Sequence, residues 1–197
     1  EGIRLGRAYV GDGRSHLIDF TVGDVELGTK DSELRLEKPG TVPVRARVAA
    51  YLPVQADPAL AARSYTQKPY WHVERARVPG TRKVKVELVV NGRAVGEKAI
   101  EADGELREVR FDVPIQASSW VAMRILATSH TNPVFVTVAG KPIRASRRSA
   151  QWCLAGVDRC WSQKKRFIGA AEMDDAEKAY AHARQAYRRI LSETTVD

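Results

Sequence analysis

Hydrophobic and polar residues alternate along much of the first part of the chain. The clearest case is Thr41–Tyr51, where valine and alanine occupy every second position and Arg45 and Arg47 lie between them. Arg107–Val113 alternates in the same way. A period of two places one face of a strand in a core and the other face in water. Both segments are therefore predicted to be strands.

Short runs of the same kind, separated by turn residues, predict further strands. Asn91-Gly92 is a strong hairpin signal, because both central residues of a type I′ turn need positive φ. Ala139–Pro142 predicts another tight reversal. The other expected strands are Ile3–Val10, His16–Val22, Glu33–Glu37, Tyr70–Val78, Val84–Val90, Arg93–Ile100, Ser119–Leu126 and Val134–Val138.

No helical pattern interrupts these strands. Such an order is typical of an antiparallel β-sandwich, of the immunoglobulin or jelly-roll kind, and not of an α/β fold. Leu52–Lys68 breaks the rhythm with Pro53 and Pro58, so we expect a long loop there that could hold a helical turn. Residues 1–144 are assigned to the sandwich domain.

After Arg144 the hydrophobic period becomes helical. Ser146 can cap a first helix that runs to about Phe167. Apolar residues spaced three and four apart in Met173–Ile190 predict a second helix, which is acidic in its first turn and basic in its last, as the helix dipole favours. The short connection predicts an antiparallel helical hairpin over residues 145–197, packed on the sandwich.

The composition is that of a folded globular chain. Its 197 residues are 44% hydrophobic and 28% charged, close to the average for soluble domains. No apolar run approaches the roughly 20 residues that span a bilayer, so we expect no membrane span. Because the chain begins Glu1-Gly2-Ile3, without Met or a signal-like stretch, we expect it to be a piece of a longer protein.

Basic residues outnumber acidic ones, which gives a formal net charge of +8 and a pI near 9.7. Residues 141–192 carry most of the excess, with twelve Lys/Arg and five Asp/Glu. One explanation is a solvated helical face that docks on an acidic surface, and another is binding of a polyanion. No RRM, KH or zinc-finger pattern accompanies the excess, so we do not expect a nucleic-acid partner.

Two cysteines, Cys153 and Cys160, lie seven residues apart in the first expected helix. On an unbroken helix their Cα atoms would be about 10.5 Å apart, which is too far for a disulfide unless the helix breaks at Gly156. We expect two free, buried thiols on one helix face.

The histidines offer little for metal binding. None of the familiar zinc-ligand spacings occurs. Asp12, His16 and Asp19 are close in sequence and could bind a metal, but they straddle a turn and the start of a strand. We therefore expect no metal site and no cofactor in this chain.

The remaining histidines have ordinary structural explanations. We expect His72 and Glu74 to form a surface pair on one strand face, His130 to cap a polar loop, and His182 to be solvated. No nucleophile elbow and no glycine-rich phosphate loop occurs, so no catalytic residue is predicted. Trp71 and Trp120 lie in expected strands; they could stack on a sugar or pack in the core.

Two parts of the chain carry a recognisable pattern. They are Gly6–Arg14 with Phe20–Gly23 and Leu27-Gly28, and Ser119–Arg124 with His130–Val136. Both parts resemble the C-terminal β-domain of CehA/McbA-type metallohydrolases, relatives of the PHP phosphoesterases. A helical tail beyond the last strands is similar too. Gly11 and Arg14 depart from the Thr and Pro that are usual in the family, so the first turn can differ.

The resemblance implies a non-catalytic accessory domain of a metal-dependent hydrolase, with the catalytic domain upstream as its partner. The family's frequent export implies a periplasmic or extracellular location in a bacterium. The open alternative is a stand-alone module that binds a carbohydrate or a polyanion. The positions that the resemblance singles out, for contacts between domains or for fixing loops, are Arg7, Asp12, Arg14, His16, Arg124, His130 and Asn132.

Overall fold

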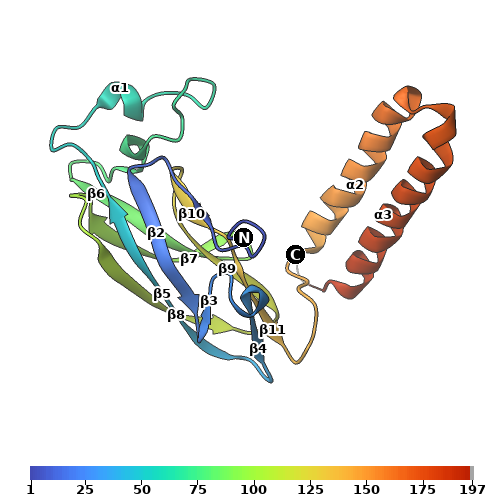
Figure 1. The fold of residues 1–197 in the computed structure, drawn as a ribbon, viewed down its shortest axis with the longest axis horizontal. Coiled ribbons are helices and arrows are strands. Elements are labelled where there is room, and N and C mark those ends of the chain that lie inside the picture. The colour runs from blue at the N-terminus through green and yellow to red at the C-terminus, as the bar shows by residue number, and fades with distance from the viewer. Residues whose placement is uncertain (196–197) are drawn as a thin grey trace. The chain divides into compact units, whose positions relative to one another are not determined.

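The computed structural model describes residues 1–195, and the chain divides into two compact units between Ile143 and Arg144. The first unit contains eleven strands in two sheets, and the second contains two long helices (Figure 1). The predicted fold class, a mainly antiparallel β-sandwich followed by helices, is confirmed. Among the described residues, no helix has the length and apolar character needed to cross a membrane.

The larger sheet has seven strands and is centred on β9. On one side β9 pairs with β6, which pairs with β7; on the other side it pairs with both β10 and β11. Beyond these, β1 runs antiparallel to β10 and β4 runs parallel to β11. The strands are β1 (Tyr9–Val10), β4 (Glu33–Leu36), β6 (Lys83–Val90), β7 (Arg93–Glu101), β9 (Ser119–Ile125), β10 (Ser129–Thr131) and β11 (Val134–Val138).

The parallel β4–β11 pair corrects the expectation of an antiparallel arrangement throughout. A tight hairpin forces its two strands to be antiparallel. The chain instead reaches β4 from the other sheet through a 3₁₀ turn, η1 (Lys30–Ser32). The direction of β4 is therefore set by the sheet that it joins.

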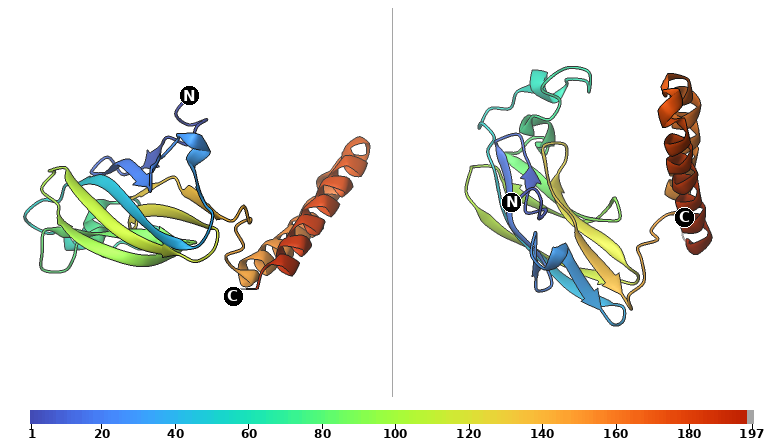
Figure 2. Two further views of the ribbon diagram at one scale, coloured as in Figure 1. Left: turned by 90° about the horizontal axis from the view of Figure 1, so that it is seen from below. Right: turned by 45° about the vertical axis from the view of Figure 1, so that its right-hand side comes forward.

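The smaller sheet has four strands in the order β3-β2-β5-β8. Inward-facing side chains of the two sheets form one core, in which Val44 of β5 and Met123 of β9 are fully buried. Figure 2 shows the two layers from other directions. The strands are β2 (Ser15–Val22), β3 (Val25–Glu26), β5 (Gly40–Ala50) and β8 (Arg107–Ile115).

Both predicted reversals have the backbone that their sequences favour. Asn91 and Gly92 adopt φ values of 51° and 87° between β6 and β7. Ala139 and Gly140 adopt φ values of 52° and 66° after β11. With these left-handed conformations, the twist of each turn matches the right-handed twist of the flanking strands.

The loop between β5 and β6 differs most from expectation. It holds the expected helical turn, α1 (Pro58–Ala61), but the predicted strand Tyr70–Val78 is wrong, because η2 (Val73–Ala76) is a 3₁₀ helix. The Nδ1 atom of His72 accepts a hydrogen bond from the Glu74 N–H at 3.0 Å and starts this turn. At the other predicted strand, Ile3–Val10, only the last two residues pair, since residues 1–7 are closed into turns by backbone hydrogen bonds.

The second unit is an antiparallel pair of helices, α2 (Arg147–Lys164) and α3 (Met173–Glu193), joined through two short 3₁₀ turns, η3 (Lys165–Phe167) and η4 (Ala170–Glu172). Ser146 caps α2 as predicted, by accepting a hydrogen bond from the Ser149 N–H at 3.0 Å. An ion pair of 2.6 Å between Arg184 and Asp158 links the helices.

The two thiols are free, but they are not buried. Cys160 is exposed and lies 3.1 Å from the Tyr180 hydroxyl, and Cys153 is half-buried. Each helix of the pair covers only one side of the other, so the pair encloses few residues. Among its described residues, Ala150 and Thr194 are the buried ones.

Candidate functional site

An open groove of about 1040 Å³ lies on the outer face of the seven-stranded sheet. Its floor comes from β9, where Trp120, Ala122 and Arg124 alternate with core residues and so point away from the core. Because alternate residues of a strand are about 6.8 Å apart, this floor extends roughly 14 Å from Trp120 to Arg124. We call this hollow the aromatic groove.

One end of the aromatic groove is aromatic and the other is polar. Trp120 lies opposite Phe135 of β11 in the strand register. At the other end, Arg124 lies opposite His130 of β10 and Glu87 of β6. Between the two ends the small side chain of Ala122 leaves the floor low.

Two further aromatic residues, Tyr70 and Trp71, line the groove from the loop between β5 and β6. Their rings are perpendicular, with centroids 4.8 Å apart, and about 40% of each side chain is exposed. The expectation of Trp71 in a strand is wrong, because the turn at η2 takes the chain off the sheet. Both tryptophans proposed for sugar stacking nevertheless line the same groove.

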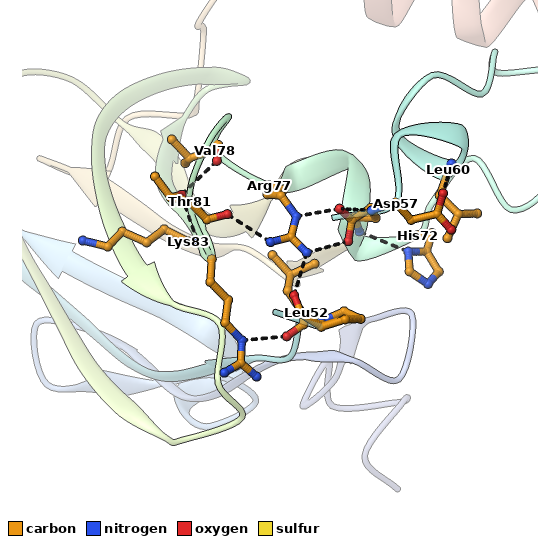
Figure 3. A network of polar contacts seen from close by, with 11 residues as sticks. Leu52, Asp57, Leu60, His72, Arg77, Val78, Thr81 and Lys83 are labelled. Carbon is orange, nitrogen blue, oxygen red and sulfur yellow. Dashed lines mark hydrogen bonds and ion pairs between the residues drawn. The ribbon is translucent and has the colours of Figure 1, made fainter. Parts of the chain in front are cut away.

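A buried ion pair holds the base of this loop (Figure 3). The Arg77 guanidinium donates to both carboxylate oxygens of Glu74, at 2.5 and 2.9 Å, and to the backbone oxygens of Thr81 and Pro53. The backbone N–H of Asp57 also donates to Glu74. The expected surface pair of His72 and Glu74 is therefore wrong: a 3₁₀ turn places Glu74 beside Arg77, and only 2% of Glu74 is exposed.

The pKa of Glu74 reflects two opposing effects. Burial raises the pKa of this carboxyl, but hydrogen bonds from Arg77 and from the Asp57 N–H more than offset burial and hold the pKa below its usual value. Glu74 is therefore ionised at neutral pH and paired with Arg77. The ion pair therefore fixes the base of the loop that carries Tyr70 and Trp71, which together we call the aromatic wall of the groove.

Asp12 fastens the other side of the same loop. Its Oδ2 accepts a hydrogen bond from the Val73 N–H at 2.9 Å, and its Oδ1 accepts from the Arg14 N–H and the Ser15 hydroxyl. Val73 follows Trp71 by two residues. Asp12 therefore ties the turn before β2 to the aromatic wall.

Replacing Asp12 with alanine is expected to lower the free energy of unfolding by about 1–3 kcal/mol, because the N–H of the buried Val73 loses its acceptor. Urea unfolding measures this loss. Asp24→Ala is the matched control: Asp24 pairs with Lys30 on the surface, where such pairs contribute about 0–1 kcal/mol. Equal losses in the two variants would contradict the role given to Asp12.

The polar end of the aromatic groove is lined by Arg124 and His130, and Glu87 pairs with Arg124 from outside the lining. Nε of Arg124 donates to Glu87 at 2.6 Å, and Nδ1 of His130 lies 3.2 Å from the Thr131 carbonyl oxygen. We expected His130 in a polar loop, but it lies in β10. The strand path breaks only at Asn132-Pro133, where proline has no N–H to donate to the ladder.

The other positions singled out by the resemblance have structural contacts. Asn132 donates from its side chain to the Gly6 carbonyl oxygen at 3.0 Å and from its backbone to Ala8, so it fixes the first turns beside the aromatic groove. The backbone of Arg7 packs closely against Gly28, where a Cβ would lie 2.5 Å from that of Arg7. The carbonyl oxygen of Arg14 accepts from Tyr51 N–H at 2.8 Å.

The structure does not bring Asp12, His16 and Asp19 together around one point. The Nδ1 atom of His16 lies 2.7 Å from the Tyr9 hydroxyl, and Asp19 pairs with Arg47 at 3.2 Å. Within residues 1–195, no group of three or more His, Cys, Asp or Glu side chains is arranged to hold a metal ion.

Sequence reasoning missed Tyr70, Phe135 and Ala122 as groove residues. A signal for part of the site was present in β9, where alternation puts a tryptophan, an alanine and an arginine on the face away from the core. An apolar surface that is open to water and rimmed by polar residues is typical of a ligand-binding groove. The contributions of the other strands depend on pairing, which spacing does not encode.

Comparisons with known proteins identify no family. No protein-family model matches the chain, and no curated protein sequence matches it. Among solved structures, it is similar to the CARDB domain of the PF1109 protein from Pyrococcus furiosus, determined in complex with di-metal ions. The identity is 11% and the TM-score 0.32, over 64% of this chain and 96% of that chain. A likeness this weak adds nothing to the site.

Proposed function

We propose that this chain is a non-catalytic accessory domain that acts by binding through the aromatic groove, beside a metal-dependent hydrolase domain encoded upstream. One observation carries the proposal. Arg124, His130 and Asn132, from the motif that resembles metallohydrolase β-domains, all line this one groove. Residues that resemble a family motif therefore coincide with the lining of this groove.

The position of the first turns supports the same proposal. Asn132 ties Gly6 and Ala8 to the rim, and Val10 and Gly11 line the groove. A domain that preceded Glu1 would thus be attached next to the aromatic groove. Arg124 and His130 are then available to contact that domain or a ligand shared with it.

Elemental analysis of the chain and of the longer protein encoded by its gene tests the accessory role. We expect bound metal and hydrolase activity in the longer protein, and neither in residues 1–197 alone. Stoichiometric metal in residues 1–197 would overturn the proposal, as would a gene that encodes no upstream domain.

A second candidate function is a stand-alone carbohydrate-binding module. The observation that favours it is the presence of both Trp71 and Trp120 in one groove. This candidate requires no upstream domain, and its ligand follows from the chemistry of the groove.

A further inference from the structure

We propose that the aromatic groove binds a neutral oligosaccharide, whose rings stack on Trp120 and Trp71 and whose hydroxyl groups bond to Arg124. The inference names a ligand class and does not depend on the upstream domain. It follows from the aromatic surfaces, the unused hydrogen-bonding groups, the charge and the size of the groove.

The aromatic residues present the surfaces that sugar rings need. A pyranose ring has an apolar C–H face and a rim of hydroxyl groups, so it is attracted to an indole or phenyl face that is partly open to water. Trp71, Tyr70 and Phe135 are each about 40% exposed and lie around the same hollow. Large, rigid aromatic side chains also lose little conformational entropy when they bind.

The polar end of the groove has hydrogen-bonding groups to spare. Arg124 donates to Glu87 through Nε, whereas a guanidinium carries five N–H donors. Its Nη groups make no hydrogen bond to the described residues. Because Glu87 holds the guanidinium in place through Nε, these remaining donors are fixed at the polar end of the groove, where sugar hydroxyl groups can accept hydrogen bonds from them.

The charge of the groove favours a neutral ligand over a polyanion. Arg124 is the one Lys or Arg among its described lining residues, and Glu87 balances it. The basic excess of the chain lies instead in residues 141–192. Phosphate or sulfate chains bind where several unpaired cations gather, and the aromatic groove offers no such cluster within residues 1–195.

The size of the groove favours more than one sugar ring. Its volume of about 1040 Å³ lies at the upper end of the roughly 300–1,000 Å³ found for small-molecule pockets. The aromatic and polar ends are separated by the low floor at Ala122. A single ring cannot occupy both ends, whereas an oligosaccharide lying along β9 can.

Binding is tested first with the unmodified chain. Titration calorimetry uses neutral hexasaccharides of β-1,4-glucose, β-1,4-xylose, β-1,4-mannose and α-1,4-glucose, together with heparin and a glycan array. We expect saturable binding to a neutral glycan with an affinity nearly constant between about 50 and 200 mM salt. In hydroxyl-radical footprinting, the bound glycan should protect Trp71 and Trp120 but not Trp152.

Variants then locate the site. Trp71→Ala and Trp120→Ala should each weaken glycan binding about tenfold, from the loss of one stacked ring. Trp152→Ala is the matched control, since Trp152 is 76% exposed in the second unit, and it should bind like the unmodified chain. If a groove variant fails to fold, the footprint of the unmodified chain still tests whether the glycan binds in the aromatic groove.

Three outcomes would overturn the inference: no binding to any neutral glycan, binding only to heparin with a steep loss on adding salt, or a footprint outside the groove. Failure here is distinguishable from failure of the accessory role. The metal content and activity of the longer protein do not depend on whether the groove binds sugar.

Discussion

Replacing Arg77 with leucine is expected to lower the free energy of unfolding by about 3–5 kcal/mol at neutral pH. Arg77 and Glu74 are 8% and 2% exposed at their side chains, so removing the cation leaves a carboxylate buried without its partner. The backbone oxygens of Pro53 and Thr81 lose their donor as well. Urea unfolding followed by circular dichroism measures the loss.

The effect should depend on pH in a defined direction. In the unmodified chain the pKa of Glu74 lies below its usual value of 4.5, so the ion pair stabilises the fold above about pH 4.5, and this contribution is lost as the pH falls further. In Arg77→Leu, Glu74 keeps the hydrogen bond from the Asp57 N–H but loses those from Arg77, so burial raises its pKa above that in the unmodified chain. The difference in the free energy of unfolding between the two proteins should therefore become smaller as the pH falls.

Two further variants separate a buried charge from lost packing. Glu74→Leu combined with Arg77→Leu should regain part of the stability, because neither charge is then left alone. Arg35→Leu removes an arginine from an exposed pair with Glu33 and should cost about 0–1 kcal/mol. A loss in Arg77→Leu no larger than that of Arg35→Leu would show that the loop does not rely on this ion pair.

Local patterns were sufficient to predict much of the fold. Alternation in Thr41–Tyr51, the Asn91-Gly92 turn and the cap at Ser146 each act within a few residues, and the structure contains β5, the β6–β7 hairpin and α2 at these places. The segment Tyr70–Val78 failed because its conformation is decided by distant partners. From outside the segment, Asp12 accepts a hydrogen bond from the Val73 N–H, and the Asp57 N–H donates to the Glu74 carboxylate.

The site was predictable only in fragments. Trp71, Trp120, Arg124 and His130 were each singled out, but for different reasons and without any indication that they meet. They meet because β9 pairs with β10 and β6, and because the loop before β6 returns to the same face. Which strands pair depends on burial summed over both sheets, and the spacing of residues along the chain carries no direct record of it.

Replacing Phe20 with alanine is expected to lower the free energy of unfolding by about 3–5 kcal/mol, through lost burial and the cavity left behind. Phe20 lies on β2, is 2% exposed and packs in the core shared by the two sheets. Urea unfolding should give a lower midpoint with an unchanged slope, because the surface exposed on unfolding stays nearly the same. Glycan binding by the protein that remains folded should be unaffected.

Phe135→Ala is the matched control and should behave in the opposite way. Phe135 is 42% exposed at the aromatic end of the groove, so its loss should change stability by about 1 kcal/mol or less while weakening the binding of neutral glycans. A phenylalanine-to-alanine substitution on the core side and one on the groove side thus distinguish a residue that stabilises the fold from a residue that contacts the ligand. If Phe135→Ala destabilised the chain as much as Phe20→Ala, Phe135 would belong to the packing of the sheet and would not offer a free surface for binding.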